Sequence, residues 1–439
     1  MPKSVSMSAG DERKPRYLVP GILLASLVAC GAMAVAIAPG ARATAAATPG
    51  SIDTAFGAGG WTSIAGSSVP GLGNLEDAVT LPSGDILLAG SAGLARLLPS
   101  GKLDPSFGSG GSATAPGVGS ADSAAVVAVQ PNGEIIDAGA TSSPDGGTEW
   151  EVARFTANGA LDTSFGAAGI VTTEVLNPAP TTITFESPSA VLLQPDGKIL
   201  VLGDVENFGG YHGNGSFFEQ AVLRYNPNGT LDSSFGTGGE ALSTTFAGAG
   251  ELGLDAAGDI FIAPGPGWTS PEAELSSSGQ LDPAVTPAAI TASSSPTLLP
   301  SGQFVAAATI GDGRSASHVQ VTRYNPGSTV ASTSALLSWT GTLGKDAGTA
   351  VGTLSAGQAL ILGSHDNGAS YVLASVTPGG TLDSTFGAGG IATFTPPAAD
   401  AGGFFPVAAL VLPAGQILVL GQATASNGSP LITLTQFTA

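Results

Sequence analysis

A short motif that returns about every 50 residues constrains this chain more than any other feature. Close copies of the pattern Leu-Asp-x-Ser-Phe-Gly occupy residues 51–57, 103–108, 161–166, 231–236 and 382–387, and two decayed copies lie near Asp282 and Ala331. The steps between aligned Asp positions, with Ala331 in place of a lost Asp, are 51, 58, 70, 50, 49 and 52 residues. A repeat of this period indicates an array of similar structural units.

Each unit contains two apolar runs around a tight turn and a third run before the motif, which is the pattern of a β-hairpin followed by another strand. The cleanest example is the unit that includes residues 190–203 and 220–225. Runs such as residues 199–202 are apolar at every position, as expected for a sheet covered on both faces. After the N-terminal segment no stretch shows a sustained helical period with caps, so helix should be nearly absent.

The two ends of the repeat region complement each other. The region opens with a motif and a short strand near Trp61, and it closes with a third strand, residues 431–437, that no fourth strand follows. An N-terminal strand that completes the last unit would join the two ends. We therefore predict an all-β fold, a seven-bladed β-propeller of four-stranded blades, as a single domain over residues 51–439 after a linker at residues 44–50.

The motif residues have structural roles in this interpretation. Arg96, Arg154 and Arg224 each stand eight residues before a motif Asp, which predicts an Arg–Asp pair across the turn. The Phe should fill space between blades, and the glycines should adopt positive φ. The pairing is imperfect, because Arg323 aligns with Ala331, and because the positions before two other motif Asp residues hold Glu274 and Ser375.

The full pattern identifies a resemblance to a known family. Leu-Asp-x-Ser-Phe-Gly-x-x-Gly, with Pro-Asp-Gly-Lys-Ile-Leu-Val-x-Gly and Arg-Tyr-Asn-Pro-Asn-Gly upstream, resembles the delta-60 repeat, a β-propeller repeat of exported, mostly bacterial proteins. The resemblance covers about residues 51–437. It implies a propeller and an extracytoplasmic setting, but no particular activity, since the family has no general assigned one.

The first 43 residues have the pattern of an export signal. Basic residues lie within positions 3–16, an apolar stretch covers 17–38, and small residues at 41–43 suit cleavage. An uncleaved membrane anchor and a lipoprotein lipidated on Cys30 are the alternatives. All three place the folded part at the cell surface or outside the cell. Because Cys30 is the one cysteine, the folded part has no disulfide and no thiol nucleophile.

Charge limits the partners. Without residues 1–43 the chain has 8 basic and 31 acidic side chains, a net charge of −23. A surface this negative repels phosphate backbones, which argues against nucleic acid. We expect a monomer whose partner is an extracellular protein or a polysaccharide, with a membrane involved only through the N-terminal anchor or lipidated Cys30.

Candidate binding residues lie in and beside the loops between the second and third strands, because function concentrates in loops on a rigid scaffold. These residues are Glu149, Trp150, Glu206, Tyr211, His212, Asp312, His318, His365 and Asp366. The three histidines with Asp312 or Asp366 form a metal hypothesis, opposed by the lack of any local ligand motif. No cofactor is expected. Trp150 and Tyr211 would either stack on sugars or pack between blades.

These observations predict a non-enzymatic binding or scaffold module at or outside the cell surface. The alternative is a secreted hydrolase or lyase that acts on a polysaccharide through carboxylates at one mouth of the channel. Its candidate carboxylates are Glu149, Glu151, Glu186, Glu206 and Glu219.

Overall fold

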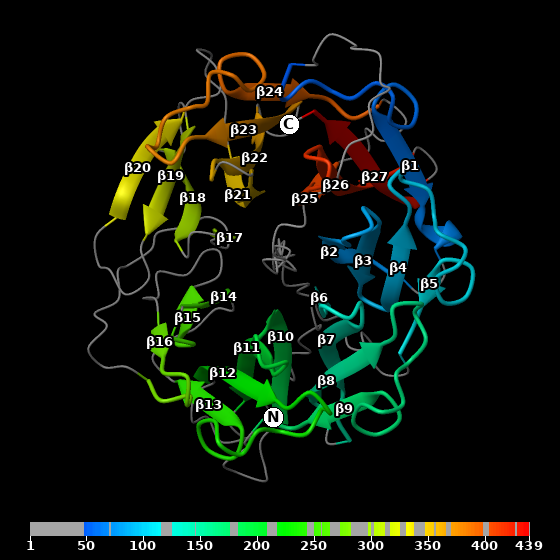
Figure 1. Cartoon of the computed structure of the whole chain (residues 1–439), viewed down its shortest axis with the longest axis vertical. Coiled ribbons are helices and arrows are strands. Elements are labelled where there is room, and N and C mark those ends of the chain that lie inside the picture. The colour runs from blue at the N-terminus through cyan, green and yellow to red at the C-terminus, as the bar shows by residue number, and fades with distance from the viewer. Residues whose placement is uncertain are drawn as a thin grey trace, which may run out of the picture.

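The computed structural model describes residues 48–438 apart from short stretches, which are 70–71, 116–124, 145, 176–182, 209–216, 244–249, 256, 264–272, 282–296, 300–302, 312–316, 325–330, 338–346, 355–356, 366–369, 398–403 and 426–427. Its strands form seven antiparallel sheets within these residues. Figure 1 shows the sheets arranged one after another around a central axis.

Three sheets make up the first half of the ring, and in each of them the first strand in sequence is the innermost and the last is the outermost. Sheet 1 is β2 (Leu75–Thr80), β3 (Ile86–Gly90), β4 (Gly93–Leu97) and β5 (Ser112–Ala113). Sheet 2 is β6 (Val126–Val129), β7 (Ile135–Ser142), β8 (Thr148–Phe155) and β9 (Ile170–Thr173). Sheet 3 is β10 (Ile183–Leu193), β11 (Ile199–Phe208), β12 (Phe217–Tyr225) and β13 (Glu240–Ser243).

Four more sheets follow around the ring, again with the innermost strand first. Sheet 4 is β14 (Glu251–Leu254), β15 (Ile260–Ala263) and β16 (Ala273–Leu275). Sheet 5 is β17 (Thr297–Leu298), β18 (Phe304–Gly311), β19 (Ser317–Tyr324) and β20 (Ala331–Leu337). Sheet 6 is β21 (Ala347–Thr353), β22 (Ala359–His365), β23 (Ser370–Val376) and β24 (Ile391–Phe394). Sheet 7 is β25 (Phe405–Val411), β26 (Ile417–Thr424), β27 (Pro430–Phe437) and β1 (Trp61–Ala65).

Sheet 7 contains strands from both ends of the described region. β1 pairs antiparallel with β27, with Trp61 opposite Thr435 and Ala65 opposite Leu431. The innermost strands contact one another in sequence, from β2 through β6, β10, β14, β17 and β21 to β25, and β25 contacts β2. Each sheet therefore packs between two neighbours, which explains why runs such as residues 199–202 of β11 are apolar at every position.

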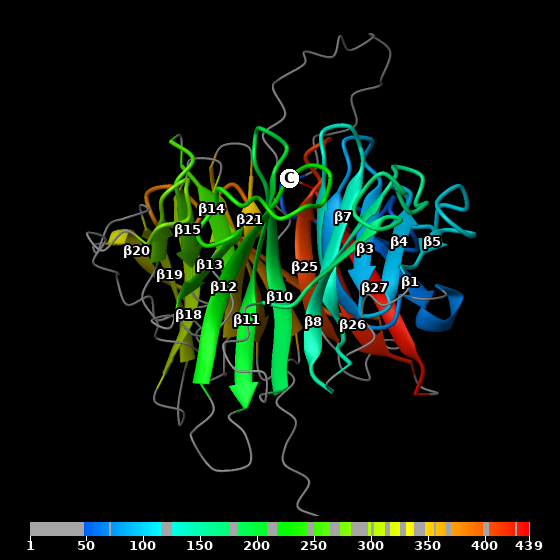
Figure 2. The same ribbon diagram turned by 90° about the horizontal axis from the view of Figure 1, so that it is seen from below.

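The ring has two different ends. At one end, which we call the hairpin mouth, the second strand of each sheet finishes and the third begins. At the other, the motif end, the third strand leads into the motif turn. Figure 2 shows the ring from the side, with β10, β11 and β12 running through its height. Hydrogen bonds between sheets occur at the hairpin mouth, where the Gln422 Nε2 of β26 donates to the Leu75 backbone oxygen of β2, 2.6 Å away.

The almost helix-free fold predicted from the sequence is confirmed for the described residues, whose one helical element is the 3-10 turn η1 (Gly66–Ser68). Sheet 4 has three strands among the described residues, and the decayed motif at Asp282, where its predicted fourth strand would follow, lies outside them. One detail differs from the prediction. The decayed motif at Ala331 is no turn at all, because Ala331 begins β20 and pairs with Tyr324.

No helix among the described residues is long and apolar enough to cross a membrane. The apolar segment at residues 17–38, on which the export and anchor hypotheses depend, lies outside the residues that the structure describes.

Candidate functional site

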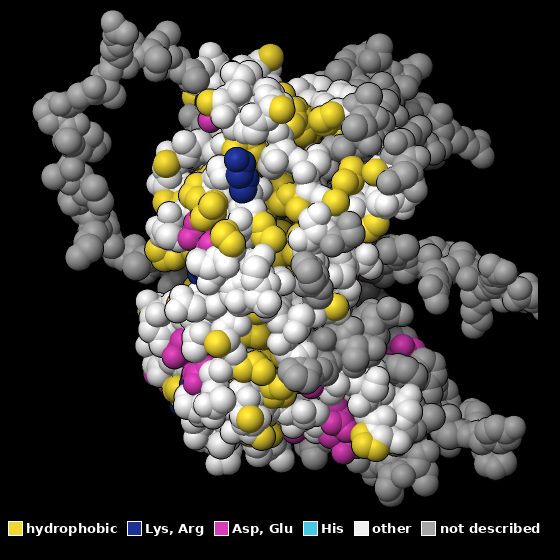
Figure 3. Space-filling model, turned by 90° about the vertical axis from the view of Figure 1, so that its right-hand side faces the viewer, with side chains coloured by type: hydrophobic (Ala, Val, Ile, Leu, Met, Phe, Trp, Pro, Cys, Tyr) yellow, Lys and Arg dark blue, Asp and Glu magenta, His cyan; other side chains and the backbone are white. Residues whose placement is uncertain are grey.

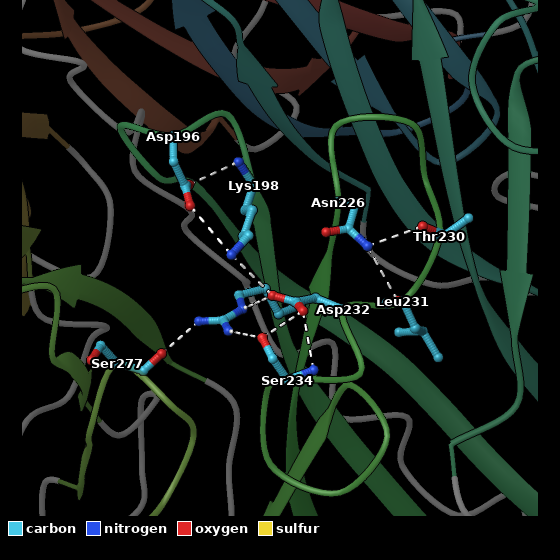
Figure 4. A network of polar contacts seen from close by, with 9 residues as sticks. Asp196, Lys198, Asn226, Thr230, Leu231, Asp232, Ser234 and Ser277 are labelled. Atoms are coloured by element: carbon cyan, nitrogen blue, oxygen red, sulfur yellow. Dashed lines mark hydrogen bonds and ion pairs between the residues drawn. The ribbon is translucent and has the colours of Figure 1, made fainter.

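The repeated Arg and Asp residues form joints between neighbouring sheets. In sheet 3 the Arg224 Nε lies 2.8 Å from Asp232 Oδ2, and the guanidinium also donates to Ser234 Oγ at 3.3 Å. Its Nη1 reaches the Ser277 backbone oxygen of sheet 4 at 2.5 Å, and its Cζ lies 4.5 Å from the centre of the Phe235 ring. Figure 4 shows this network, including the contact of Lys198 with Asp232. One guanidinium thus holds the motif turn and the next sheet together.

The same joint recurs in sheets 1 and 2. Arg96 pairs with Asp104 and donates to the Ala157 backbone oxygen at 2.7 Å, and Arg154 repeats this with Asp162 and Pro227. The three Arg–Asp pairs predicted from the eight-residue spacing are therefore present. Burial opposes ionisation of Asp104, but its bonds to Ser106 and the charge of Arg96 outweigh burial and lower its pKa. These carboxylates are engaged in structure.

A group of carboxyls is sealed between sheets 1 and 2. Asp77, Asp137 and Glu151 are at most 4% exposed, and the Asp77 carboxylate accepts the Val127 N–H of β6 at 3.0 Å. Burial raises the pKa of Asp137 to about 7, helped by the negative charges of Glu151 and Asp77, and neither carboxyl oxygen of Asp137 has a hydrogen-bond partner among the described residues. Burial likewise raises the pKa of Asp77 to about 7. Perturbed pKa values often mark functional sites, but substrate cannot reach these groups.

The predicted loop residues occupy the hairpin mouth wherever the structure describes them. Glu149 lies at the start of β8 and Glu206 near the end of β11, and both are half-buried. Burial raises the pKa of Glu206. His318 in β19 and His365 in β22 hold corresponding strand ends, but their side chains lie outside the described set. Tyr211, His212, Asp312 and Asp366 also lie outside the described residues.

Trp150 is completely buried at this mouth. Its ring packs against Gly203 of sheet 3, where a Cβ atom would come within 2.7 Å of Trp150 Cζ2. This is packing between sheets, the alternative to sugar stacking, because a ring with no exposed surface cannot contact a ligand from solvent. Glu151 and Glu186 are buried in the same way, at 4% and 1% exposed.

The described residues contain no cluster of ligands that would support the metal hypothesis. Within them, no group of three or more His, Cys, Asp or Glu side chains is arranged to hold an ion. The proposed ligands His212, Asp312 and Asp366 fall outside that set, so this hypothesis stays a prediction.

Three residues that sequence reasoning missed lie together where sheets 7 and 1 meet at the hairpin mouth. Phe405, the first residue of β25, is 69% exposed, and it is the one aromatic among the large exposed hydrophobic side chains of the described residues. Gln422 pairs opposite Phe405 and donates to the Leu75 backbone oxygen, next to Glu76. We call Glu76, Phe405 and Gln422 the rim site.

Glu76 owes its position to a β-bulge. The register of β2 shifts between Leu75 and Asp77, so Glu76 is the extra residue at the start of this innermost strand. β10 and β25 bulge at the same place, around Ser189 and Val407. Glu76 is half-buried, and burial raises its pKa to about 7. The available signal was an acidic residue at a repeat position where other units hold uncharged ones.

The repeat matches a known family model in part. Residues 81–107, 130–165 and 194–235 match DUF5122, a β-propeller domain of unknown function. The chain folds as a β-propeller. The match supports a β-propeller repeat. The description of the matched family does not name the delta-60 repeat, which the sequence pattern resembles. No curated protein matches the propeller sequence.

Several solved structures are similar to this propeller at low identity. A protein of unknown function from Dyadobacter fermentans is 14% identical, with a TM-score of 0.40, over 72% of this chain and 93% of that one. The Nup133 β-propeller domain of Vanderwaltozyma polyspora is 10% identical, with a TM-score of 0.43, over 85% and 97%. The polysaccharide lyase Uly1 is 12% identical, with a TM-score of 0.39, over 82% and 89%. Scores this low carry no argument about what this propeller does.

Proposed function

We propose that this protein is an exported seven-bladed β-propeller that binds an extracellular polysaccharide or protein at the hairpin mouth, through the rim site, without transforming it. Each of the seven sheets corresponds to one blade, with β1 as the last strand of the seventh. The basic and apolar N-terminal segment supports export. The whole chain then acts as a rigid support for residues at its mouth.

The exposure of Phe405 carries this proposal. The other large aromatic side chains near it are buried, among them Phe404 at 4% and Tyr371 at 6%. Phe405, at 69% exposure, leaves apolar surface in water beside the polar groups of Gln422 and Glu76, and a partner would cover both. A ring beside an amide and a carboxyl is also a suitable surface for a sugar, whose apolar face stacks on aromatics while its hydroxyls form hydrogen bonds.

The outer side of the ring is a weaker candidate for a binding surface than the hairpin mouth. Figure 3 shows one side of the ring, where hydrophobic side chains are scattered among uncharged polar groups and the acidic residues lie in separate small groups. Single exposed apolar side chains of this kind are normal on a protein surface. The mouth is therefore the better candidate.

The binding test compares two single-residue variants. Purified full-length protein is incubated with insoluble cellulose, chitin and peptidoglycan and with immobilised proteins of a bacterial envelope, and the bound fraction is measured. Phe405→Ala should weaken binding about tenfold or more, as loss of a central aromatic contact does. Leu242→Ala, which trims another exposed hydrophobic residue on the outermost strand β13, should bind like the native protein. Equal binding by native protein and Phe405→Ala would refute the proposal.

One observation favours the hydrolase or lyase alternative. A general acid or base works best with a pKa near the working pH, and the pKa of Glu76 is about 7 at a half-buried position on an innermost strand. If the protein releases reducing or unsaturated ends from a polysaccharide, and Glu76→Gln abolishes this while Glu174→Gln, at an exposed residue after the outermost strand β9, does not, the enzymatic alternative replaces the binding function.

A further inference from the structure

The joint between sheets 7 and 1 at the motif end departs from the Arg joints. Gln436 of β27 occupies the position that Arg96 holds in sheet 1. The alignment is fixed by the backbone, since the Asp53 N–H donates to the Gln436 oxygen at 2.8 Å, as the Asp104 N–H does to the Arg96 oxygen at 2.8 Å. The motif Asp of this joint, Asp53, therefore faces a shorter, uncharged side chain.

A pocket lies where the guanidinium sits in the other joints. Its volume is about 510 Å³, and its walls include Asp53, Phe56, Pro99, Ser100, Gln416 and Gln436. Asp53 and Phe56 come from the first motif copy, whereas Pro99 and Ser100 come from the turn of sheet 1 that follows β4. The pocket thus lies between the two sheets, at the opposite end of the ring from the rim site.

The polar groups of this pocket have spare hydrogen-bonding capacity. Asp53 Oδ1 accepts the Ala55 N–H at 3.0 Å, while Asp53 Oδ2 has no partner among the described residues. Gln436 is 7% exposed, but its amide is not among the buried polar atoms that lack a partner, and Asp53 is half-buried, so both polar groups reach the solvent in the pocket. Polar groups that line a pocket and that the protein does not itself engage are available to a ligand. A ligand that supplies several N–H donors would satisfy these groups.

The Arg224 joint shows which donor group fits. There the guanidinium contacts a carboxylate, Asp232, a turn carbonyl at Ser277 and the face of a phenyl ring, Phe235. The corresponding groups in the pocket are Asp53, the Pro99 carbonyl and Phe56. The pairing of turns supports this correspondence, because a Cβ on Gly101 would lie 2.8 Å from the Phe56 ring, as one on Gly279 would lie 2.8 Å from the Phe235 ring.

Loss of the Arg does not by itself open such a pocket. Sheet 6 also lacks it, with Ser375 at that position, but there Gln358 Nε2 donates to the motif Asp383 at 3.2 Å. Gln416 holds the position of Gln358 in sheet 7, since the Leu412 N–H donates to its oxygen as the Leu354 N–H does to that of Gln358. Its side chain makes no bond to Asp53 within the described residues. The joint between sheets 7 and 1 thus combines a motif carboxylate that lacks a cation with a pocket beside it.

We propose that this pocket binds a guanidinium group that comes from another molecule, either the arginine side chain of a partner polypeptide or a small guanidino compound. The ligand takes the place that the chain's own arginines hold in sheets 1, 2 and 3. The planar, always charged guanidinium suits a carboxylate, a carbonyl and an aromatic face together, which an ammonium does not match.

Calorimetric titration of the full-length protein with arginine amide, lysine amide, methylguanidinium and urea tests the proposal. Arginine amide and methylguanidinium should bind, and arginine amide should bind about tenfold or more tightly than lysine amide. Urea, which is planar but uncharged, should not bind. Equal affinities for arginine amide and lysine amide would overturn the assignment. A short arginine-containing peptide that binds more tightly than methylguanidinium identifies a polypeptide as the source, and equal affinities identify a small compound.

Three variants locate the ligand. Asp53→Asn should weaken arginine amide binding about tenfold or more, whereas Asp196→Asn, which removes the same charge from an exposed turn, should leave it unchanged. Gln436→Arg supplies the guanidinium from the chain itself, so it should raise the melting temperature and abolish arginine amide binding. Native affinity in both Asp53→Asn and Gln436→Arg contradicts the proposal, and Asp53→Asn alone decides it if Gln436→Arg does not fold.

Discussion

Phe107 lies against Gly159 of the next sheet, so closely that a Cβ atom on Gly159 would come within 2.9 Å of its ring. The relation repeats between Phe165 and Gly229 and between Phe235 and Gly279. Each of these motif Phe residues therefore packs against the turn glycine that follows it in the ring. The repeat is better understood as a contact between units than as a unit by itself.

Replacing one of these glycines tests the contact directly. Gly279→Ala should lower the free energy of unfolding in two ways, because φ is +81° there and because the new Cβ would lie 2.7 Å from the Gly236 nitrogen. The matched control is Gly238→Ala, where φ is +72° and nothing lies within 4 Å. Both variants lose about 1–2 kcal/mol from the left-handed backbone, and Gly279→Ala loses about 1–3 kcal/mol more from crowding. Urea unfolding measures the difference, and equal losses would disprove the packing role.

Removing a joint arginine should be more damaging than its charge alone suggests. Arg224→Ala leaves the Ser277 carbonyl without its donor, whereas Asp232 keeps Lys198 and Ser234 as partners, so we expect a loss of about 2–3 kcal/mol in the free energy of unfolding. Lys102→Ala, an exposed residue of like charge, should change it by less than about 0.5 kcal/mol. Denaturant titration of both variants checks this, and a small effect of Arg224→Ala would show that the joints contribute little.

Stability should fall as pH rises from about 4 to about 7. The pKa of Asp137 is raised from 3.8 to about 7 in the folded protein, so the folded state holds a proton that the unfolded state has released in this window. Each such proton makes the free energy of unfolding fall by about 1.4 kcal/mol per pH unit. The contribution of Asp137 to the free energy of unfolding is fully present below its pKa in the unfolded chain. It is lost once the pH has risen through its pKa in the folded protein. Melting temperatures measured from pH 4.5 to 8 should show the decline.

Two variants assign that decline to Asp137. Asp137→Leu places there the residue found at the equivalent Leu88, and Asp137→Asn keeps the shape without the charge. Both should flatten the pH dependence, and Asp137→Leu should stabilise the protein most above pH 7. An unchanged slope in Asp137→Asn would mean that other groups cause it. The motif carboxylates act in the opposite sense, since the lowered pKa of Asp162 means that its contribution disappears only in acid.

The pairing of β1 with β27 predicts the effect of shortening the chain. A chain that begins at residue 66 lacks β1 and the first motif copy, so the edge of β27 is exposed. Exposed edges pair with other chains, and we expect aggregation or loss of cooperative unfolding. A chain that begins at residue 48 keeps both and should unfold in one transition. Size-exclusion chromatography and thermal melting compare the two.

The fold could be predicted because the motif that determines it is repeated along the chain. One motif seen five times revealed the period, the positions of the hairpins and the Arg–Asp pairs at Arg96, Arg154 and Arg224. Prediction failed where the repeat decays. At Ala331 alignment alone suggested a turn, but a β-strand forms there instead, since no Asp or Gly remains to make the turn.

The rim site could not be predicted, because it depends on contacts that do not repeat from sheet to sheet. The exposure of Phe405 and the burial of Trp150 depend on which neighbours cover each ring, and adjacent sheets supply those neighbours from distant parts of the sequence. Glu76 differs from its equivalents, because it is an acidic residue at a bulge position that Ser189 and Val407 hold in other sheets. This equivalence can be recognised only when the pairing register of the strands is known. From the sequence we predicted a binding site in and beside loops, whereas the rim site lies on strands.

The shared sheet of β1 and β27 also affects when the protein can fold. β1 is made long before its partner β27, because Trp61 pairs with Thr435. A nascent chain in which β27 has not yet emerged from the ribosome lacks the partner of β1. The earlier sheets can form one by one, but the sheet that β1 and β27 share must wait until β27 has emerged. Cooperative stability is therefore acquired in a single late step, and until then the N-terminal strand stays available to chaperones and proteases.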